Sequence, residues 1–230
     1  MDRPLYQVSD VQLLICGMQR SQSLEIMDDL STPEEVWESV YHELGFVHRF
    51  LGNHATIVSA LRRDPRPIHR VLDIGCGDGA LLSRIRRTLA VDVIGVDLRA
   101  PRTPPGVPIV HADATRDLLP PADVAICLMV AHHLSEEDLI SMIRNTARSV
   151  RRLIILDLVR HWLPLALFRL FVCPLVNHIV AVDGLQSVRR SFTPAELRRI
   201  VERAVAGTGA RFDQVVAPLL SRQVIDIVWS

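Results

Sequence analysis

The stretch Arg70-Val-Leu-Asp-Ile-Gly-Cys-Gly-Asp-Gly79 decides how this 230-residue chain folds. Its first five residues are mostly apolar, which predicts a strand buried inside a sheet. Three glycines follow at alternate positions, where the backbone must bend sharply or let a ligand approach closely. The apolar spacing from Ala80 to Ile85 then predicts a helix, whose first turn offers unpaired N–H groups. The stretch therefore predicts a strand, a turn and a helix that together cradle a nucleotide-like ligand.

The spacing of these glycines indicates which nucleotide-like ligand fits. Dinucleotide-binding folds use Gly-x-Gly-x-x-Gly and place a pyrophosphate at the helix N-terminus. Here the third glycine comes one residue early, and Asp73 precedes the turn, where a carboxylate suits a cationic ligand better than a pyrophosphate. The run Asp73-Ile-Gly-Cys-Gly-Asp-Gly79 closely resembles the first motif of class I S-adenosylmethionine methyltransferases. The resemblance implies S-adenosylmethionine as cofactor, a molecule with an ammonium and a sulfonium but no phosphate, and S-adenosylhomocysteine as product.

Three later strands carry the remaining features of that resemblance in the expected order. The strand Val91–Val96 ends at Asp97, at the distance where an acid takes a ribose diol. A short strand over Val107–His111 leads to Asp113, which the resemblance implies accepts a hydrogen bond from the adenine amino group. A fourth strand spans Asp123–Leu128. The cofactor-binding residues implied by the resemblance are Asp73, Gly75, Cys76, Gly77, Asp97, Leu98, Asp113, Ala114 and Leu128.

Strands that alternate with helices, including a fifth strand over Arg152–Asp157, predict an α/β fold with a doubly wound, mostly parallel sheet. Ligands of such folds bind at the carboxyl ends of the strands. Two strand-like segments, Arg211–Pro218 and Arg222–Trp229, would form the antiparallel hairpin that closes the sheet in the resembled family. The resemblance covers residues 67–230, which we expect to form the cofactor-binding domain.

Residues 1–66 are expected to form an N-terminal helical cap segment. Ser31-Thr-Pro-Glu-Glu35 is a helix start, with a hydroxyl cap, a proline in the first turn and acids near the positive end of the helix dipole. In the resembled family such helices cover the cofactor cleft, and packing on the sheet is the alternative. Residues 160–190 are predicted to be a helical insert that forms a lid. Its expected parts are helices near Leu163–Leu170 and Val172–Val180 and a polar turn over Asp183–Arg190.

Two adjacent histidines follow the fourth strand and are the candidates for catalysis. Methyl transfer from a sulfonium is an in-line displacement, so the protein must position the acceptor and, for a hydroxyl, remove its proton. Histidine is the usual base near neutral pH. The run His132-His-Leu-Ser-Glu-Glu137 is similar to His-Asp-Trp-Ser-Asp-Glu of phenolic O-methyltransferases, whose first histidine is the base. His132 is therefore the first candidate and His133 the second; the alternatives are a structural role for both, or a base at His161 or His178.

Charge and cysteine content narrow the class of protein. Twenty-six arginines, with no lysine, balance 26 acidic residues, so no net field favours a nucleic acid partner and no lysine can form a Schiff base. Four scattered cysteines without a Cys-x-x-Cys pair predict reduced thiols in a cytoplasmic protein. An arginine and two prolines interrupt the apolar region Trp162–Val182, which favours a buried or lid-forming helix pair over a stable membrane span. No metal site is predicted, and a homodimer is left open.

The methyl acceptor is expected to be a small hydrophobic molecule. No Asn-Pro-Pro-Tyr motif follows the fourth strand, which speaks against methylation of a nucleobase or a glutamine amide, and an apolar lid suits a hydrophobic ligand. Runs such as Asp157-Leu-Val-Arg160 and Phe192-Thr-Pro-Ala-Glu196 look like those of bacterial small-molecule methyltransferases found with type III polyketide synthases. This resemblance implies O-methylation of a phenolic or polyketide product in secondary metabolism. The alternatives are a catalytically inactive cofactor-binding partner subunit, a protein or RNA methyltransferase, and a nicotinamide oxidoreductase.

Overall fold

The computed structural model describes residues 6–7, 17–29, 31–99 and 104–229, so the start of the expected cap segment lies largely outside the described residues. The described strands form one sheet in the order β1-β7-β8-β6-β5-β2-β3-β4. Strands β4, β3, β2, β5 and β6 are parallel to one another, whereas β8, β7 and β1 pair antiparallel. The predicted fold class is therefore confirmed, including the antiparallel C-terminal hairpin. The strands are β1 (Tyr6–Gln7), β2 (Arg70–Ile74), β3 (Asp92–Asp97), β4 (Ile109–His111), β5 (Val124–Leu128), β6 (Arg152–Leu158), β7 (Arg211–Val216) and β8 (Arg222–Val228).

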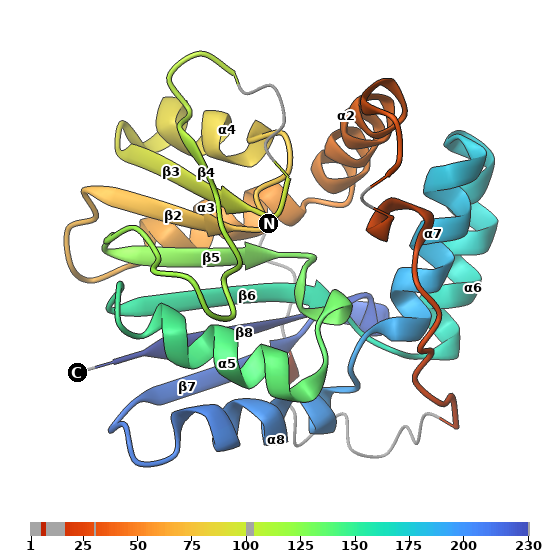
Figure 1. The fold of residues 1–230 in the computed structure, drawn as a ribbon. Coiled ribbons are helices and arrows are strands. Elements are labelled where there is room, and N and C mark those ends of the chain that lie inside the picture. Colours follow the sequence, from red (N-terminus) through yellow and green to blue (C-terminus); the bar gives the residue numbers. More distant parts are fainter. Residues whose placement is uncertain (1–5, 8–16, 30, 100–103, 230) are drawn as a thin grey trace.

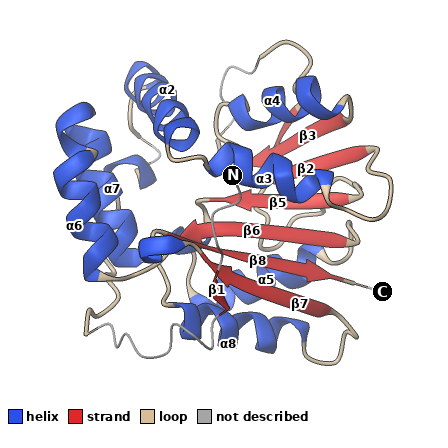
Figure 2. Cartoon of the chain, turned by 180° about the vertical axis from the view of Figure 1, so that it is seen from behind, coloured by secondary structure: helices blue, strands red, loops and turns tan. Residues whose placement is uncertain are grey.

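Helices cover both faces of this sheet and also stand beyond the carboxyl ends of its parallel strands (Figure 1). Helices α3 and α4 pack on one face and α5 and α8 on the other (Figure 2). Helices α2, α6 and α7 lie beyond the strand ends, where ligands of this fold class bind. The helices are α2 (Glu34–Phe50), α3 (Asn53–Arg62), α4 (Ala80–Leu89), α5 (Glu136–Thr146), α6 (Trp162–Phe171), α7 (His178–Arg190) and α8 (Pro194–Val205), with short 3-10 helices η1 (Ile26–Asp28), η2 (Ala131–His133), η3 (Cys173–Leu175) and η4 (Pro218–Leu220).

The central strand β2 forms as its sequence predicts. Val71, Leu72 and Ile74 are at most 2% exposed, because helices cover both faces of the sheet. Asp73 interrupts this apolar run and lies opposite Gly95 of β3 and Ile126 of β5 in the sheet register. Strand β2 therefore places one carboxylate inside the apolar sheet, one residue before the glycine turn.

The predicted polar turn over Asp183–Arg190 is wrong, because these residues form the second half of α7. Asn177 caps this helix by accepting a hydrogen bond from the Val180 N–H at 2.9 Å. The glycine at position 184 is packed against Phe168 of α6, since a Cβ there would lie 2.3 Å from the ring. Asp183, Gln186 and Arg190 bind residues of the N-terminal segment, whereas Arg189 is exposed. Most polar residues here therefore serve packing and do not mark a turn.

The structure also bears on the predictions for the cysteines and for the apolar insert. Cys76, Cys127 and Cys173 are free thiols, as predicted, while Cys16 lies outside the described residues. None of the described helices has the length and apolar character that a bilayer span requires. The insert is instead folded into α6, η3 and α7, which pack against one another beside the sheet edge (Figure 1).

Candidate active site

A cavity of about 390 Å³ lies at the carboxyl ends of the parallel strands. Its lining comes from the glycine turn after β2, the residues that follow β3, β4 and β5, and helices α2, α6 and α7. The structure brings all of the predicted cofactor-binding and catalytic residues to this cavity, namely Asp73, Gly75, Cys76, Gly77, Asp97, Leu98, Asp113, Ala114, Leu128, His132 and His133.

The glycine turn needs its glycines for conformation and for space. Gly75 has φ of +69°, and a Cβ there would lie 2.4 Å from Cγ2 of Val130. Gly77 has φ of +53°, and a Cβ would lie 3.0 Å from Cε1 of Tyr41 on α2. Helix α2 therefore covers the turn, whereas α3 packs on the sheet through Ile57 and its neighbours. The first residues of α3, Asn53 and His54, also border the cavity, and a role of these helices as a cap over the cofactor stays a prediction.

Asp73 is a buried carboxylate whose demand for hydrogen bonds is not met by the protein. The residue is 2% exposed, and its Oδ1 has no hydrogen-bond partner among the described residues. Burial, together with the nearby charge of Asp97, raises its pKa well above the usual range. A buried, unpaired carboxylate oxygen is costly unless a ligand satisfies it. Its position on the cavity wall therefore suits a ligand with a cationic group.

Asp97 holds the glycine turn in place while also facing the cavity. Its Oδ2 accepts a hydrogen bond from the Gly77 N–H at 2.8 Å, and its Oδ1 accepts from the Arg99 N–H at 2.9 Å. Burial raises its pKa above the usual value. The same burial raises the pKa of the neighbouring Tyr41 phenol. Each carboxylate oxygen keeps a further lone pair, so Asp97 can also accept from ligand hydroxyls.

Asp113 is engaged by its own loop. Its Oδ1 accepts hydrogen bonds from the Thr115 N–H at 2.9 Å and from the Thr115 hydroxyl at 2.6 Å. Its Oδ2 lies 3.1 Å from Nε of Arg116. These contacts fix the turn after β4 at the cavity wall, and the adenine contact expected of Asp113 stays a prediction.

His132 is fixed in orientation by a buried carboxylate. Asp157 at the end of β6 accepts from the His132 N–H at 2.8 Å and lies 2.7 Å from His132 Nδ1. The contacts of Asp157 with His132 outweigh the effect of burial and lower the pKa of Asp157. An ionised carboxylate only accepts, so Nδ1 of His132 carries the proton that it donates to Asp157. In the neutral ring, Nε2 consequently has its lone pair free to act as a base or as a ligand.

His133 has a similar carboxylate partner from a distant part of the chain. Its Nδ1 lies 2.7 Å from Oδ1 of Asp28, and Arg190 of α7 binds the other oxygen of that carboxylate. Although burial works in the opposite direction, the hydrogen bonds from His133 and Arg190 hold the pKa of Asp28 well below its usual range. Both histidines of the η2 turn are therefore oriented through Nδ1 by a carboxylate.

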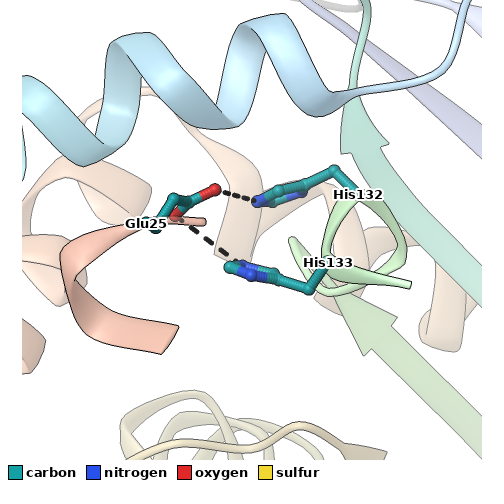
Figure 3. A group of neighbouring side chains, drawn as sticks. All are labelled: Glu25, His132 and His133. Carbon is teal, nitrogen blue, oxygen red and sulfur yellow. Dashed lines mark ion pairs between the residues drawn. The ribbon is translucent and has the colours of Figure 1, made fainter. Parts of the chain in front are cut away.

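Glu25 faces the two histidines from the opposite side (Figure 3). Its Oε1 is 3.7 Å from His132 Nε2, and its Oε2 is 3.9 Å from His133 Nε2. The residue is 7% exposed, Oε1 has no hydrogen-bond partner among the described residues, and burial raises its pKa to about 7. The cavity wall thus presents two imidazoles and a carboxylate directed at one another.

The segment that carries Glu25 is held over the cavity by α7. The carboxylate of Asp183 on α7 accepts two hydrogen bonds from the backbone of this segment, from the Ile26 N–H at 2.8 Å and from the Met27 N–H at 3.0 Å. Figure 1 shows this segment, red at the start of the described chain, running across α7. From the sequence, no site role is assigned to the residues near position 25, and Arg190 is placed in a polar turn. Four site residues are therefore missed, namely Glu25, Asp28, Tyr41 and Arg190.

The other two candidate histidines lie outside the cavity lining. His161 is 3% exposed and caps α6, because its Nδ1 accepts from the Leu163 N–H at 3.1 Å. His178 is exposed at the first position of α7. His132 and His133 are therefore the histidines of the predicted set that reach the site.

The doubly wound sheet, the glycine turn and the buried acids at its strand ends define an α/β protein with a nucleotide-type ligand site. The sequence model of a family described as "Methyltransferase domain" matches residues 44–204. This match spans well over half of the chain, and the chain belongs to that family. The predicted class, a class I methyltransferase, is confirmed. No curated protein sequence matches the chain significantly.

Solved methyltransferase structures share this fold. The plantazolicin methyltransferase BpumL, in complex with a monoazolic desmethylPZN analog and S-adenosylhomocysteine, aligns with a TM-score of 0.67 and 13% identity over 89% of this chain and 92% of that chain. Human N-acetylserotonin methyltransferase in complex with S-adenosylmethionine aligns with a TM-score of 0.63 and 14% identity. The alignment covers 91% of this chain and 60% of that chain. The O-methyltransferase NcsB1 from neocarzinostatin biosynthesis aligns with a TM-score of 0.61 and 14% identity, over 90% of this chain and 62% of that chain. Its structure holds S-adenosylhomocysteine and 1,4-dihydroxy-2-naphthoic acid. At such identities the likeness concerns the fold.

Proposed function

We propose that this methyltransferase transfers the methyl group of S-adenosylmethionine to a hydroxyl of a small hydrophobic acceptor, a phenolic or polyketide-type metabolite. The observation that carries the proposal is the unpaired, buried Oδ1 of Asp73 on the wall of a cavity that also contains His132 and His133. A cationic adenosyl donor would supply the missing partner of that carboxylate. The two histidines line the same cavity, where they would face the acceptor.

The residues around the glycine turn fit this donor. Asp73 would take its ammonium, Asp97 its ribose hydroxyls and Asp113 its adenine amino group. The backbone of the glycine turn and the side chains of Leu98 and Leu128 would form the surrounding walls, together with Gly75, Cys76, Gly77 and Ala114. When bound, S-adenosylmethionine supplies a methyl group that its positive sulfur already activates, so the protein need not generate an electrophile.

The chain's own contribution is to hold the acceptor and to activate its hydroxyl. His132 Nε2 has a free lone pair in the neutral ring and can take the hydroxyl proton, which is the role expected of the first histidine. His133 is the second activating group. Apolar side chains from α2, α6 and α7, such as Leu44, Phe168 and Val180, line the cavity and favour a hydrophobic acceptor. The O-methyltransferase NcsB1, crystallised with a dihydroxynaphthoic acid, supports an acceptor of this kind.

Several coarser expectations stay part of this proposal. Residues 1–66 would act as a cap segment on the cofactor-binding domain 67–230, and the helical insert 160–190 would act as a lid, because α6 and α7 contribute to the cavity wall. The enzyme would work in the cytoplasm on a free small molecule, without nucleic acid or membrane insertion, and a homodimer remains open. The alternatives are an inactive donor-binding partner subunit and a protein or RNA methyltransferase.

Two measurements test the proposal. Calorimetry with S-adenosylhomocysteine should show binding to one site per chain, and NAD should not bind. Incubation with methyl-labelled S-adenosylmethionine and a panel of phenols, including 1,4-dihydroxy-2-naphthoic acid, should place the label on oxygen. Tight NAD binding without S-adenosylhomocysteine binding would overturn the proposal. Donor binding without turnover on any phenol would favour the inactive subunit, and label in the macromolecules of a cell extract would favour the protein or RNA substrate.

A further inference from the structure

Glu25, His132 and His133 are arranged as the ligands of one metal ion would be (Figure 3). One ligand atom from each residue lies within 4.8 Å of the other two. The carboxylate oxygens are 3.7 and 3.9 Å from the two Nε2 atoms, too far for hydrogen bonds. Two ligands of a tetrahedral Zn²⁺ lie about 3.4 Å apart, since their bonds to the ion are about 2.0–2.2 Å long. The two carboxylate–imidazole distances are therefore only a few tenths of an ångström longer than the ligand spacing of a Zn²⁺ site.

The partners of these three groups are also those of a metal centre. Histidines that bind metals almost always donate their second ring N–H to a carboxylate, a backbone carbonyl or a water, which orients the ring and makes the ligating nitrogen more basic. Here His132 Nδ1 meets Asp157 and His133 Nδ1 meets Asp28, each at 2.7 Å. Both Nε2 atoms are thereby directed toward Glu25. A single histidine base requires one such carboxylate, and the second one has no role in a mechanism with one base.

One carboxylate oxygen of Glu25, Oε1, is buried without a hydrogen bond among the described residues. The residue is 7% exposed. Arg190 forms an ion pair with that oxygen at 3.6 Å, while its hydrogen bonds go to Asp28 and the His133 carbonyl. A bound cation would satisfy this oxygen, because burying a charge is costly unless it is paired or coordinates a metal.

The ligand types select the kind of cation. Imidazole nitrogens suit first-row transition metal ions such as Zn²⁺ and Fe²⁺, whereas Mg²⁺ and Ca²⁺ prefer sites made of oxygen atoms. Two histidines and one carboxylate also leave at least one coordination position open, as in catalytic zinc sites. All three residues border the cavity, so the open position is available to a ligand bound there.

We propose that Glu25, His132 and His133 form a binding site for a divalent transition metal ion, Zn²⁺ or an ion of similar preference, at the acceptor end of the cavity. The inference rests on the proposed function and deepens it. A hydroxyl bound to such an ion loses its proton at a lower pH than a free hydroxyl. The O–H bond breaks, the electron pair stays on the metal-bound oxygen and the proton goes to water. The two histidines would then activate the acceptor as ligands, and His132 would not need to accept the proton.

Metal binding can be measured without any methyl acceptor. Protein freed of metal with EDTA and dialysed is titrated with Zn²⁺ in a calorimeter, and with Mg²⁺ as a comparison. We expect one Zn²⁺ per chain and no Mg²⁺ binding at the same concentration. Glu25→Gln and His133→Gln should each lower the affinity for Zn²⁺ by more than about 100-fold, because loss of a second-sphere partner alone costs 10–100-fold. The control His178→Gln, at an exposed histidine outside the cavity, should bind Zn²⁺ like the natural chain.

Two results would overturn the site. The first is a natural chain that takes up no Zn²⁺, and the second is Zn²⁺ binding that survives both substitutions. If the variants fail to fold, X-ray absorption on the Zn²⁺-loaded natural chain decides the question. Two imidazole nitrogens and one carboxylate oxygen as protein ligands would support the site, whereas sulfur ligation or a single imidazole would refute it.

The role of the ion is tested separately from the donor site. Metal-free protein should still bind S-adenosylhomocysteine, because the donor residues around Asp73 and Asp97 are not among the proposed ligands. Its methylation of a phenol should fall, and added Zn²⁺ should restore it. Full turnover in the metal-free protein would overturn coordination as the means of activation while leaving the proposed function intact. Failure to bind S-adenosylhomocysteine would instead count against the proposed function.

Discussion

Asp73 and Asp157 occupy equivalent places in the sheet but have opposite surroundings. Each is 2% exposed and precedes the last residue of a parallel strand, Asp73 on β2 and Asp157 on β6, with β5 between them. Asp157 accepts hydrogen bonds from two groups of His132 and from the Leu158 N–H, and its pKa is lowered. Oδ1 of Asp73 has no partner among the described residues, and its pKa is raised by burial. The carboxylate on β6 is therefore satisfied within the protein, while the carboxylate on β2 is left for a ligand to complete.

The same difference extends to the residues around these two acids. On the β2 side, the wall is made mainly of backbone groups of one glycine turn, held by Asp97. On the β6 side, side chains from distant segments bind one another, as His133 does with Asp28 and Asp28 with Arg190. We infer that substitutions on the β6 side should cost stability as well as turnover. Substitutions on the β2 side should act chiefly on donor binding.

The largest effect is expected when Asp157 is replaced by Asn. The amide offers one acceptor oxygen to three N–H donors and adds an NH₂ group among them. Removing one partner of a buried pair in this way should lower the free energy of unfolding by about 3 kcal/mol or more. Urea unfolding of the ligand-free protein at pH 7 measures this change.

Asp73→Asn is the matched control, because it makes the same chemical change at the same depth. Its raised pKa means that the ionised carboxylate destabilises the folded protein at pH values above the ordinary aspartate pKa of about 3.9. The substitution should therefore leave the free energy of unfolding at pH 7 unchanged or increase it, while weakening S-adenosylhomocysteine binding. Equal destabilisation by the two substitutions would remove the distinction between the two sides.

The next largest effect is expected on turnover when His132 is replaced by Ala. Whether the imidazole takes the acceptor proton or holds a metal ion, its loss removes the activating group and should lower turnover about 100-fold or more. Affinity for S-adenosylhomocysteine should change little, because His132 is on the acceptor side. Steady-state kinetics with labelled donor and calorimetry on the same preparation measure both quantities. A variant with near-normal turnover would assign acceptor activation to another group.

Asp97→Ala tests the β2 side from the other direction. Loss of charge-assisted contacts to the ribose hydroxyls should weaken S-adenosylhomocysteine binding by about 1–3 kcal/mol. The Gly77 N–H loses its acceptor as well, so the turn itself becomes less well ordered. Calorimetry at pH 7 measures the affinity, and Asp113→Ala, whose carboxylate is engaged by its own loop, provides a comparison on the adenine side. Unchanged affinity in Asp97→Ala would refute the ribose role.

The two sides also differ in how far the sequence reveals them. The β2 side is local, because strand, turn and helix follow one another within twenty residues, from Arg70 to Leu89, and each has its own pattern of apolar residues and glycines. Asp97 and Asp113 could be placed beside the glycine turn because the carboxyl ends of parallel strands lie on the same side of the sheet. The predicted residues of this side accordingly all line the cavity.

The β6 side depends on contacts that no local pattern encodes. His133 meets Asp28 across 105 positions, and Arg190 meets Asp28 across 162. The histidines could be predicted because they come shortly after β5, but Glu25 could not, since no local pattern indicates that its segment packs against α7. Helix α7 was mistaken for a turn over Asp183–Arg190 for the same reason, because its polar residues have their partners in the N-terminal segment.

His54 is a buried base whose Nδ1 lacks a hydrogen bond among the described residues, as Oδ1 of the buried acid Asp73 does. Its replacement is expected to have the smallest effect on stability. The residue is 4% exposed, and burial lowers its pKa to about 4. Because the unfolded chain binds the proton at the ordinary pKa of about 6.5, stability should fall as the pH drops from 6.5 toward 4, by about 1–2 kcal/mol between pH 7 and pH 5. In His54→Asn, which cannot titrate, the loss of stability between these pH values should shrink by that amount in urea unfolding. His48, whose ring centroid is 6.1 Å from that of His54, remains in both proteins. Its pKa is lowered by burial and also by His54, so the substitution reduces the contribution of His48 to the loss in the same direction. An identical pH dependence in the two proteins would show that His54 gains a partner in solution and does not belong with Asp73.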